Sequence, residues 1–88
     1  MVHAVLATVR VEEPEKARAL LEDARVSPVQ RAPGFVSALW LEPLEGIGMS
    51  VIVFDSEEHA RAAMDYPLPP IPGVTPLSLE LREVYAHA

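Results

Sequence analysis

The stretch PGFVSALWLEP, residues 33–43, decides how the rest of the chain is interpreted. A proline stands at each end, and the β-branched and aromatic residues between them predict a short strand. Side chains of a strand alternate between two faces. Both predicted faces are apolar, the first with Phe35, Leu39 and Leu41 and the second with Val36, Ala38 and Trp40. A strand of this kind must be covered on both sides.

The sequence on either side predicts the element order β-α-β-β-α-β. The expected strands cover residues 2–11, 34–42, 49–54 and 77–88, and the expected helices cover 12–25 and 55–66, with a separate helical turn at 27–31. Asp55 or Ser56 is the expected N-cap of the second helix. Five prolines within residues 67–76 exclude a helix or a central strand and predict a stiff connector.

This order is typical of a ferredoxin-like α+β fold, which a single domain over residues 1–88 accommodates. Right-handed crossovers give a four-stranded antiparallel sheet of order 4-1-3-2 with both helices on one face. The first and third strands are then central, and they are the two most uniformly apolar.

The other face of such a sheet is left without cover, although three of its strands are apolar on both faces. An exposed apolar patch of this extent normally marks an interface. We therefore expect a second copy of the chain to pack sheet against sheet, giving a homodimeric α+β barrel. On the last strand, Glu80 and Arg82 share one face, and we expect them to form an ion pair at this interface.

Composition excludes several classes of protein. The chain has 13 acids against 7 bases and a net charge of −6, with no basic cluster, so neither nucleic acid nor an anionic membrane is an expected partner. There is no cysteine, which excludes disulfides and thiolate metal sites. The first ten residues lack the pattern of a signal peptide, and the expected location is the cytoplasm.

Three segments carry a family resemblance: residues 33–43, GIGMSVIVFDSEEHARAA at 46–63, and the terminal REVYAHA at 82–88. Together they resemble the antibiotic-biosynthesis-monooxygenase-like (ABM) domains of the dimeric α+β barrel class. The resemblance covers nearly the whole chain and is clearest at residues 33–63. It implies the same barrel, and it is more specific for fold than for function, because members include cofactor-free oxygenases, haem-degrading enzymes and other activities.

The haem-degrading branch fits this sequence poorly. Its members use an asparagine, a tryptophan and a histidine, and this chain contains no asparagine. Trp40 also lies on the second strand, whereas the tryptophan of that branch lies nearer the second helix. The oxygenase branch needs neither metal nor flavin, so we expect no cofactor.

The candidate substrate-binding residues are Trp40 and Arg82. An indole in a pocket stacks on an aromatic substrate, but a lone tryptophan on a two-faced apolar strand also fits a core or an interface, which we favour. Tyr66, at the end of the second helix, is a candidate catalytic donor or acid. Its alternative role is to anchor the helix end.

His59 is the candidate general base, since imidazole exchanges protons near neutral pH. Its position among acids in the first helical turn also fits a solvated side chain. His3 and His87 are expected to be exposed near the termini. The three histidines lack metal-ligand spacing, and no metal site is expected.

Two hypotheses for function stay open at this point. The first is an ABM-like, cofactor-independent monooxygenase acting on an aromatic metabolite, and the second is a non-catalytic dimeric module that binds a small molecule or a protein. Small side chains are expected to leave a pocket under the helices, namely alanines 4, 7, 17, 24, 60 and 63. A pocket without convergent polar groups favours the second hypothesis.

Overall fold

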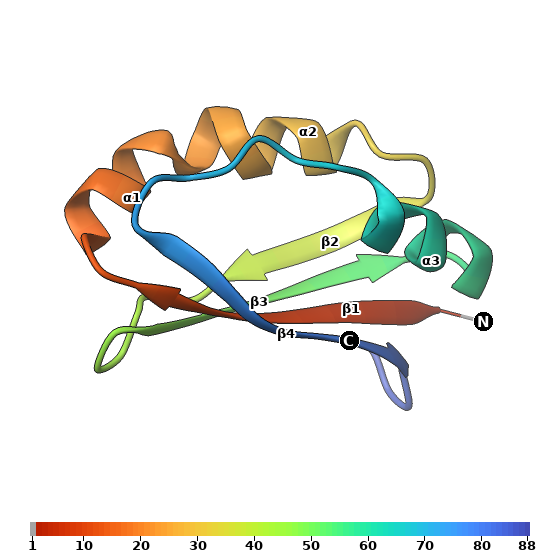
Figure 1. The fold of residues 1–88 in the computed structure, drawn as a ribbon. Coiled ribbons are helices and arrows are strands. Elements are labelled where there is room, and N and C mark those ends of the chain that lie inside the picture. The colour runs from red at the N-terminus through yellow and green to blue at the C-terminus, as the bar shows by residue number, and fades with distance from the viewer. Residues whose placement is uncertain (1) are drawn as a thin grey trace.

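Four strands form one antiparallel sheet in the computed structural model, which describes residues 2–88, and the helices lie on one side of it (Figure 1). The strands are β1 (His3–Val11), β2 (Phe35–Trp40), β3 (Ile47–Phe54) and β4 (Val74–Glu83). The helices are α1 (Pro14–Leu21), the π-helix η1 (Glu22–Val26), α2 (Ser27–Gln30) and α3 (Glu57–Asp65). The predicted α+β class and element order are confirmed.

The strands are ordered β2-β3-β1-β4, which is the predicted order read from the opposite edge. β1 pairs with β3 on one side and with β4 on the other, so β1 and β3 are the central strands, as their apolar composition predicts. Residue 5 of β1 illustrates the register, since Val5 lies opposite both Ile52 and Leu81.

A β-bulge in β2 corrects the predicted assignment of its two faces. The register between β2 and β3 shifts between Phe35 and Ser37, so strict alternation does not hold across this step. Phe35 consequently packs against the core beneath the helices, although alternation grouped it with Leu39, which is 62% exposed. An extra residue on one strand bends the ladder and resets which side chains share a face.

The first helical segment is continuous from Pro14 to Gln30, whereas the sequence predicted a helix and a separate turn. Within η1 the backbone changes its hydrogen-bond spacing, and the N–H of Ser27 donates to the carbonyl of Glu22, five residues earlier. Pro28 has no N–H to offer the carbonyl of Ala24. The π-helix lets the chain pass through Pro28 without ending the helix.

The core lies at the α3 end of the sheet. Its buried centre is Val5, Phe54 and Ala60, around which pack Ala32, Phe35, Ile52, Ala63, Met64 and Leu81. By contrast, α1 and η1 contain no buried residue. Packing therefore holds α3 against the sheet, and Val29 of α2 is also buried, but α1 and η1 stand off the sheet.

His3 is buried, which corrects the expectation that it is exposed. As the first residue of β1 it lies opposite both Phe54 and Glu83, with a strand on either side. Its Nε2 atom is 3.7 Å from a carboxylate oxygen of Glu57, in the first turn of α3. Burial follows from this position beneath the helix. His87 is exposed, as expected.

The sheet face away from the helices, here called the open face, carries an apolar row across three strands. In the register Leu39 lies opposite Val51, Val51 opposite Leu6, and Leu6 opposite Glu80 of the edge strand. Leu6 and Val51 are only partly buried, and Leu39 is exposed. Among residues 2–88, no helix has the length and apolar character needed to cross a membrane.

Gly34 fixes the turn between the first helical segment and β2. Its φ is +79°, in the left-handed region that glycine tolerates best. Its carbonyl accepts a hydrogen bond of 2.8 Å from the N–H of Asp55. A Cβ at this position would lie less than 3.0 Å from Nδ1 of His59 and from a carboxylate oxygen of Asp55.

We predict that Gly34→Ala lowers the free energy of unfolding by more than Gly46→Ala, which is the matched control. Both glycines have almost the same φ, so each substitution costs about 1–2 kcal/mol in backbone conformation. A Cβ at Gly46 would meet only the Val11 carbonyl oxygen at 3.7 Å, whereas a Cβ at Gly34 clashes with Asp55 and His59. Urea denaturation measures both, and equal losses would contradict the close packing at Gly34.

Candidate functional site

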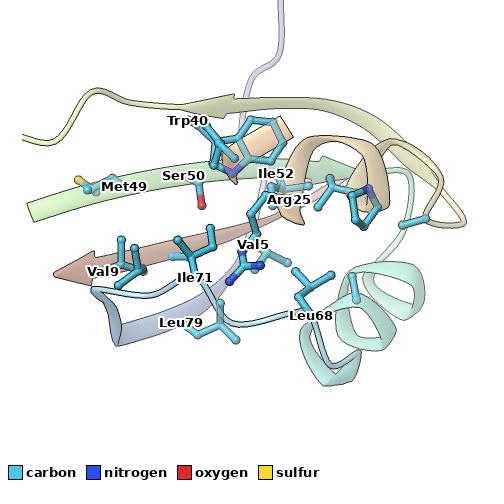
Figure 2. A pocket seen from close by; sticks show the side chains of 18 of the residues that line it. Val5, Val9, Arg25, Trp40, Met49, Ser50, Ile52, Leu68, Ile71 and Leu79 are labelled. Atoms are coloured by element: carbon cyan, nitrogen blue, oxygen red, sulfur yellow. The ribbon is translucent and has the colours of Figure 1, made fainter. Parts of the chain in front are cut away.

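A cavity of about 1080 Å³ lies between the sheet and the helices (Figure 2). It occupies the region over which α1 and η1 stand off the sheet. Its lining comes from all four strands, from the helices and from the connector, which we define as residues 66–73 between α3 and β4. Most of these side chains are apolar, and the space is enough for a small aromatic molecule.

One row of residues crosses the floor of the cavity. Trp40 lies opposite Ser50, Ser50 opposite Ala7, and Ala7 opposite Leu79, so all four strands contribute. All four residues line the cavity. Figure 2 shows Trp40 and Ser50 on the same side of the sheet, with the indole over its surface. Trp40 thus lines the cavity, although the sequence favoured a core or interface position for it and kept the pocket as the alternative. The sheet row supplies one hydroxyl beside it.

The cavity is covered by small helical residues and by the connector. Ala17 and Leu21 of α1 line it from above, and Leu68 and Ile71 line it from the connector. Ile71 is buried, which holds this proline-rich segment against the domain. Of the alanines expected to leave space, Ala7, Ala17 and Ala63 line the cavity, Ala60 is part of the core, and Ala4 and Ala24 are not among the lining residues.

Arg25 is the cavity residue that the sequence did not reveal. Its Nη1 donates to the carbonyl of Ala24 at 2.9 Å and to the carbonyl of Pro69 at 2.6 Å. The first acceptor is the carbonyl that Pro28 cannot serve. Burial lowers the pKa of the Arg25 guanidinium, because partial desolvation disfavours its charged form. The signal in the sequence was Pro28, four residues after Ala24. Because proline has no N–H, the Ala24 carbonyl lacks its α-helical donor and can accept from a side chain.

A second arginine stands at the rim of the cavity. Arg18 of α1 forms an exposed ion pair with Glu42, which follows β2, and both residues contribute to the lining. The pair joins the helix to the end of β2. Its charges compensate each other, whereas Arg25 and the exposed Arg31, which also contributes to the lining, have no carboxylate oxygen within 4.0 Å among residues 2–88.

His59 lines the cavity at the α3 end. Its Nδ1 lies 2.6 Å from a carboxylate oxygen of Asp55, and its backbone N–H donates to the side chain of Ser56, which is the N-cap. The hydrogen bond from His59 holds the pKa of the Asp55 carboxyl below its usual range. With Nδ1 engaged in this way, Nε2 is the ring atom left to exchange a proton.

Tyr66 and Arg82 differ in their relation to this cavity. Tyr66 lines it at the end of α3, although the side chain is 68% exposed. Arg82 lies opposite Ala4, on the open face, because the cavity side of β4 carries Leu79 and Leu81. Its guanidinium is 3.6 Å from Glu80, the expected partner. The structure brings Trp40, His59 and Tyr66 to one cavity and leaves Arg82 outside it.

No metal centre is evident in the described part of the chain. Within residues 2–88, no group of three or more histidine, aspartate or glutamate side chains is placed to hold a metal ion. No family model matches the chain, and neither curated proteins nor solved structures give a significant match.

The pairing of Asp55 with His59 predicts a measurable acid titration. We expect the Asp55 pKa to lie below its ordinary value of 3.8 and to rise in His59→Ala, because the hydrogen bond to the carboxylate is then lost. Since the folded-state pKa is depressed, the stability contributed by Asp55 is present above pH 3.8 and is lost as the pH falls through the folded value. Titration followed by NMR of the side-chain carboxyl measures the shift.

Arg61→Ala is the control for this titration. Arg61 donates to Glu57 at 2.8 Å and holds the pKa of that carboxyl below its usual range. Its removal should raise the Glu57 pKa and leave that of Asp55 in place. An Asp55 pKa that stays low in His59→Ala would show that the pair does not cause the shift.

Proposed function

We propose that this chain is a small ABM-like protein that binds an apolar, preferably aromatic, small molecule in the cavity between sheet and helices. The observation that carries the proposal is the cavity itself, with Trp40 on its floor. The four-stranded antiparallel sheet, the element order and the helices on one face support the family resemblance. Fold alone does not choose a substrate, so the choice of ligand class rests on the lining.

The lining favours stacking over polar recognition. Trp40 shares the cavity lining with Val9, Ile52 and Ile71, and Figure 2 shows these apolar side chains around the cavity. An indole offers a large flat surface, and aromatic pairs add about 0.5–1.5 kcal/mol beyond the burial of apolar area. Ser50, opposite Trp40 in the sheet, offers one hydroxyl to a polar substituent of the ligand.

Binding of naphthol, a neutral aromatic probe, tests this proposal. We expect calorimetry to show saturable binding to the wild-type protein and about fivefold weaker binding to Trp40→Leu, which loses the stacking surface. Leu44→Ala is the control, because Leu44 is 77% exposed and is not part of the cavity lining. Failure of the wild-type protein to bind any flat apolar probe would overturn the proposal.

A second candidate function, cofactor-independent oxygenation, is favoured by the His59–Asp55 pair. Asp55 orients the imidazole, and Nε2 of His59 can accept a proton from a phenolic or anthrone-type substrate. In the anthrone case a CH₂ group becomes a carbonyl. One atom of dioxygen becomes the carbonyl oxygen, and the other leaves as water with the two hydrogens. Tyr66, at the same end of the cavity, is the candidate donor to the developing oxyanion.

Oxygen uptake with anthrone and quinol substrates tests the second function. We expect His59→Ala to lower the rate by about a hundredfold, the usual contribution of a general base. His87→Ala, the same change at an exposed histidine, should leave the rate intact. Uptake at the background rate in the wild-type protein would remove the oxygenase function while leaving the binding function in place.

We also propose that two chains associate through their open faces. The row of Leu39, Val51 and Leu6 gives each copy an apolar surface, and the Glu80–Arg82 pair at one edge offers charges of both signs to a partner. A chain of this size has little core of its own, so covering this face contributes substantially to stability. A second copy is the occupant that the family resemblance implies.

Sedimentation tests the dimer. At micromolar concentration we expect twice the chain mass of 9.6 kDa for the wild-type protein and a shift towards the monomer in Leu39→Glu. Leu44→Glu places the same charge on another exposed leucine, in the turn between β2 and β3, and should remain dimeric. A wild-type species of 9.6 kDa would contradict the proposal.

A further inference from the structure

Arg25 places a positive charge inside the otherwise apolar part of the cavity. It is partly buried, and it lines the same space as Val5, Leu68 and Leu79. Figure 2 shows its guanidinium among these side chains, close to the middle of the labelled group. A charge held among apolar groups loses hydration, and such charges are normally paired.

The structure gives Arg25 no such pair. Within residues 2–88, its guanidinium has no carboxylate oxygen within 4.0 Å, and its hydrogen-bond acceptors are the two backbone carbonyls of Ala24 and Pro69. Arg18, Arg61 and Arg82 have acid partners in Glu42, Glu57 and Glu80. Arg10 and Arg31 have none within residues 2–88, but both are exposed, whereas Arg25 is partly buried. The charge of Arg25 therefore lacks compensation in a protein whose net charge is −6.

The two hydrogen bonds leave one edge of the guanidinium available. Both use Nη1, which carries two N–H groups. The three N–H groups on Nε and Nη2 donate to no acceptor in the described part of the chain. The Nε–Nη2 edge presents two parallel N–H groups, the arrangement that binds a carboxylate through both of its oxygens.

Holding the connector to the helix does not by itself require a charge. A neutral amide side chain donates to backbone carbonyls without the loss of charge hydration that Arg25 incurs. The contacts to Ala24 and Pro69 therefore do not explain why a charged guanidinium stands here. They also leave the Nε–Nη2 edge without a role.

From these observations we infer that the ligand of the cavity is an apolar acid, whose flat body stacks on Trp40 and whose carboxylate binds the Nε–Nη2 edge of Arg25. The inference rests on the proposed binding function and adds the charge of the ligand to it. Ser50, which lines the cavity from the sheet, is placed as a further donor to a polar group of such a ligand. Within this site Arg25 is the residue that determines specificity for acids over neutral molecules.

Calorimetry with naphthoate and naphthamide tests the inference, because the two probes share one aromatic body and differ in charge. The wild-type protein should bind naphthoate at least about tenfold more tightly, as expected for a charge-assisted bidentate contact. In Arg25→Gln the two affinities should become equal within about twofold, with the loss confined to naphthoate. Arg25→Lys keeps the charge but not the fork and should retain part of the preference.

Arg10→Gln is the matched control, because it makes the same change in net charge at an exposed residue outside the cavity lining, and it should keep the full preference. Circular dichroism shows whether Arg25→Gln folds. If it does not, the comparison of naphthoate with naphthamide on the wild-type protein still tests the inference. Equal wild-type affinities, or a preference that survives in folded Arg25→Gln, would overturn the inference and leave the binding function standing. Absence of binding by both probes and by naphthol would overturn the binding function itself.

Discussion

The missing N–H of Pro28 is the constraint on which the candidate site depends. Without it the carbonyl of Ala24 has no α-helical donor, the helix passes through a π-helical turn, and Nη1 of Arg25 takes up that carbonyl. The same nitrogen reaches the carbonyl of Pro69 and so ties the connector to the helix. The Arg25 side chain thereby joins the helix to the connector. The cavity lies beneath these two segments.

That space exists because the core is concentrated at one end of the sheet. Phe54 of β3 and Ala60 of α3 are almost fully and fully buried where α3 meets the sheet, whereas α1 and η1 bury no residue. In a domain of this size, filling the second region as well would have added stability, since each buried methylene contributes about 0.8 kcal/mol. The chain instead places alanines there, at positions 7 and 17, and forgoes that contribution. Packing that is left incomplete in this way is typical of binding sites.

The fold could be predicted from the sequence because its signals are local and periodic. The order of the strands followed from right-handed crossovers and agreed with the apolar character of β1 and β3. Residue type and spacing left Asp55 or Ser56 as the N-cap of α3, and the structure has Ser56. The β-bulge in β2 and the π-helix could not be predicted in this way, since each changes the period on which the prediction relies. The burial of His3 depends on α3, a segment some fifty residues away in sequence.

The sequence could place those site residues whose positions follow from a regular strand or helix, and it could not place the others. Trp40 belongs to a strand and lies in the cavity, and His59 and Tyr66 lie at its α3 end. Arg82 lies with Glu80 on the open face, as strand alternation predicted, and so away from these three residues. Arg25 looked like one more solvated helical charge, and its role depends on a carbonyl left by a proline and on a connector far away in the sequence.

The bulge between Phe35 and Ser37 also makes strand pairing, and not only composition, a determinant of which way the side chains of β2 face. With it, the strand sends Phe35 into the core and Trp40 into the cavity from the same side of the sheet. If the same residues paired without the bulge, with Phe35 still opposite Phe54 and Val36 opposite Val53, the rest of the strand would turn over. The indole would then belong to the open face and Leu39 to the cavity. Loss of the bulge alone would thus exchange the cavity side and the open side of this strand without altering any side chain, whereas deletion of the extra residue would leave both sides as they are.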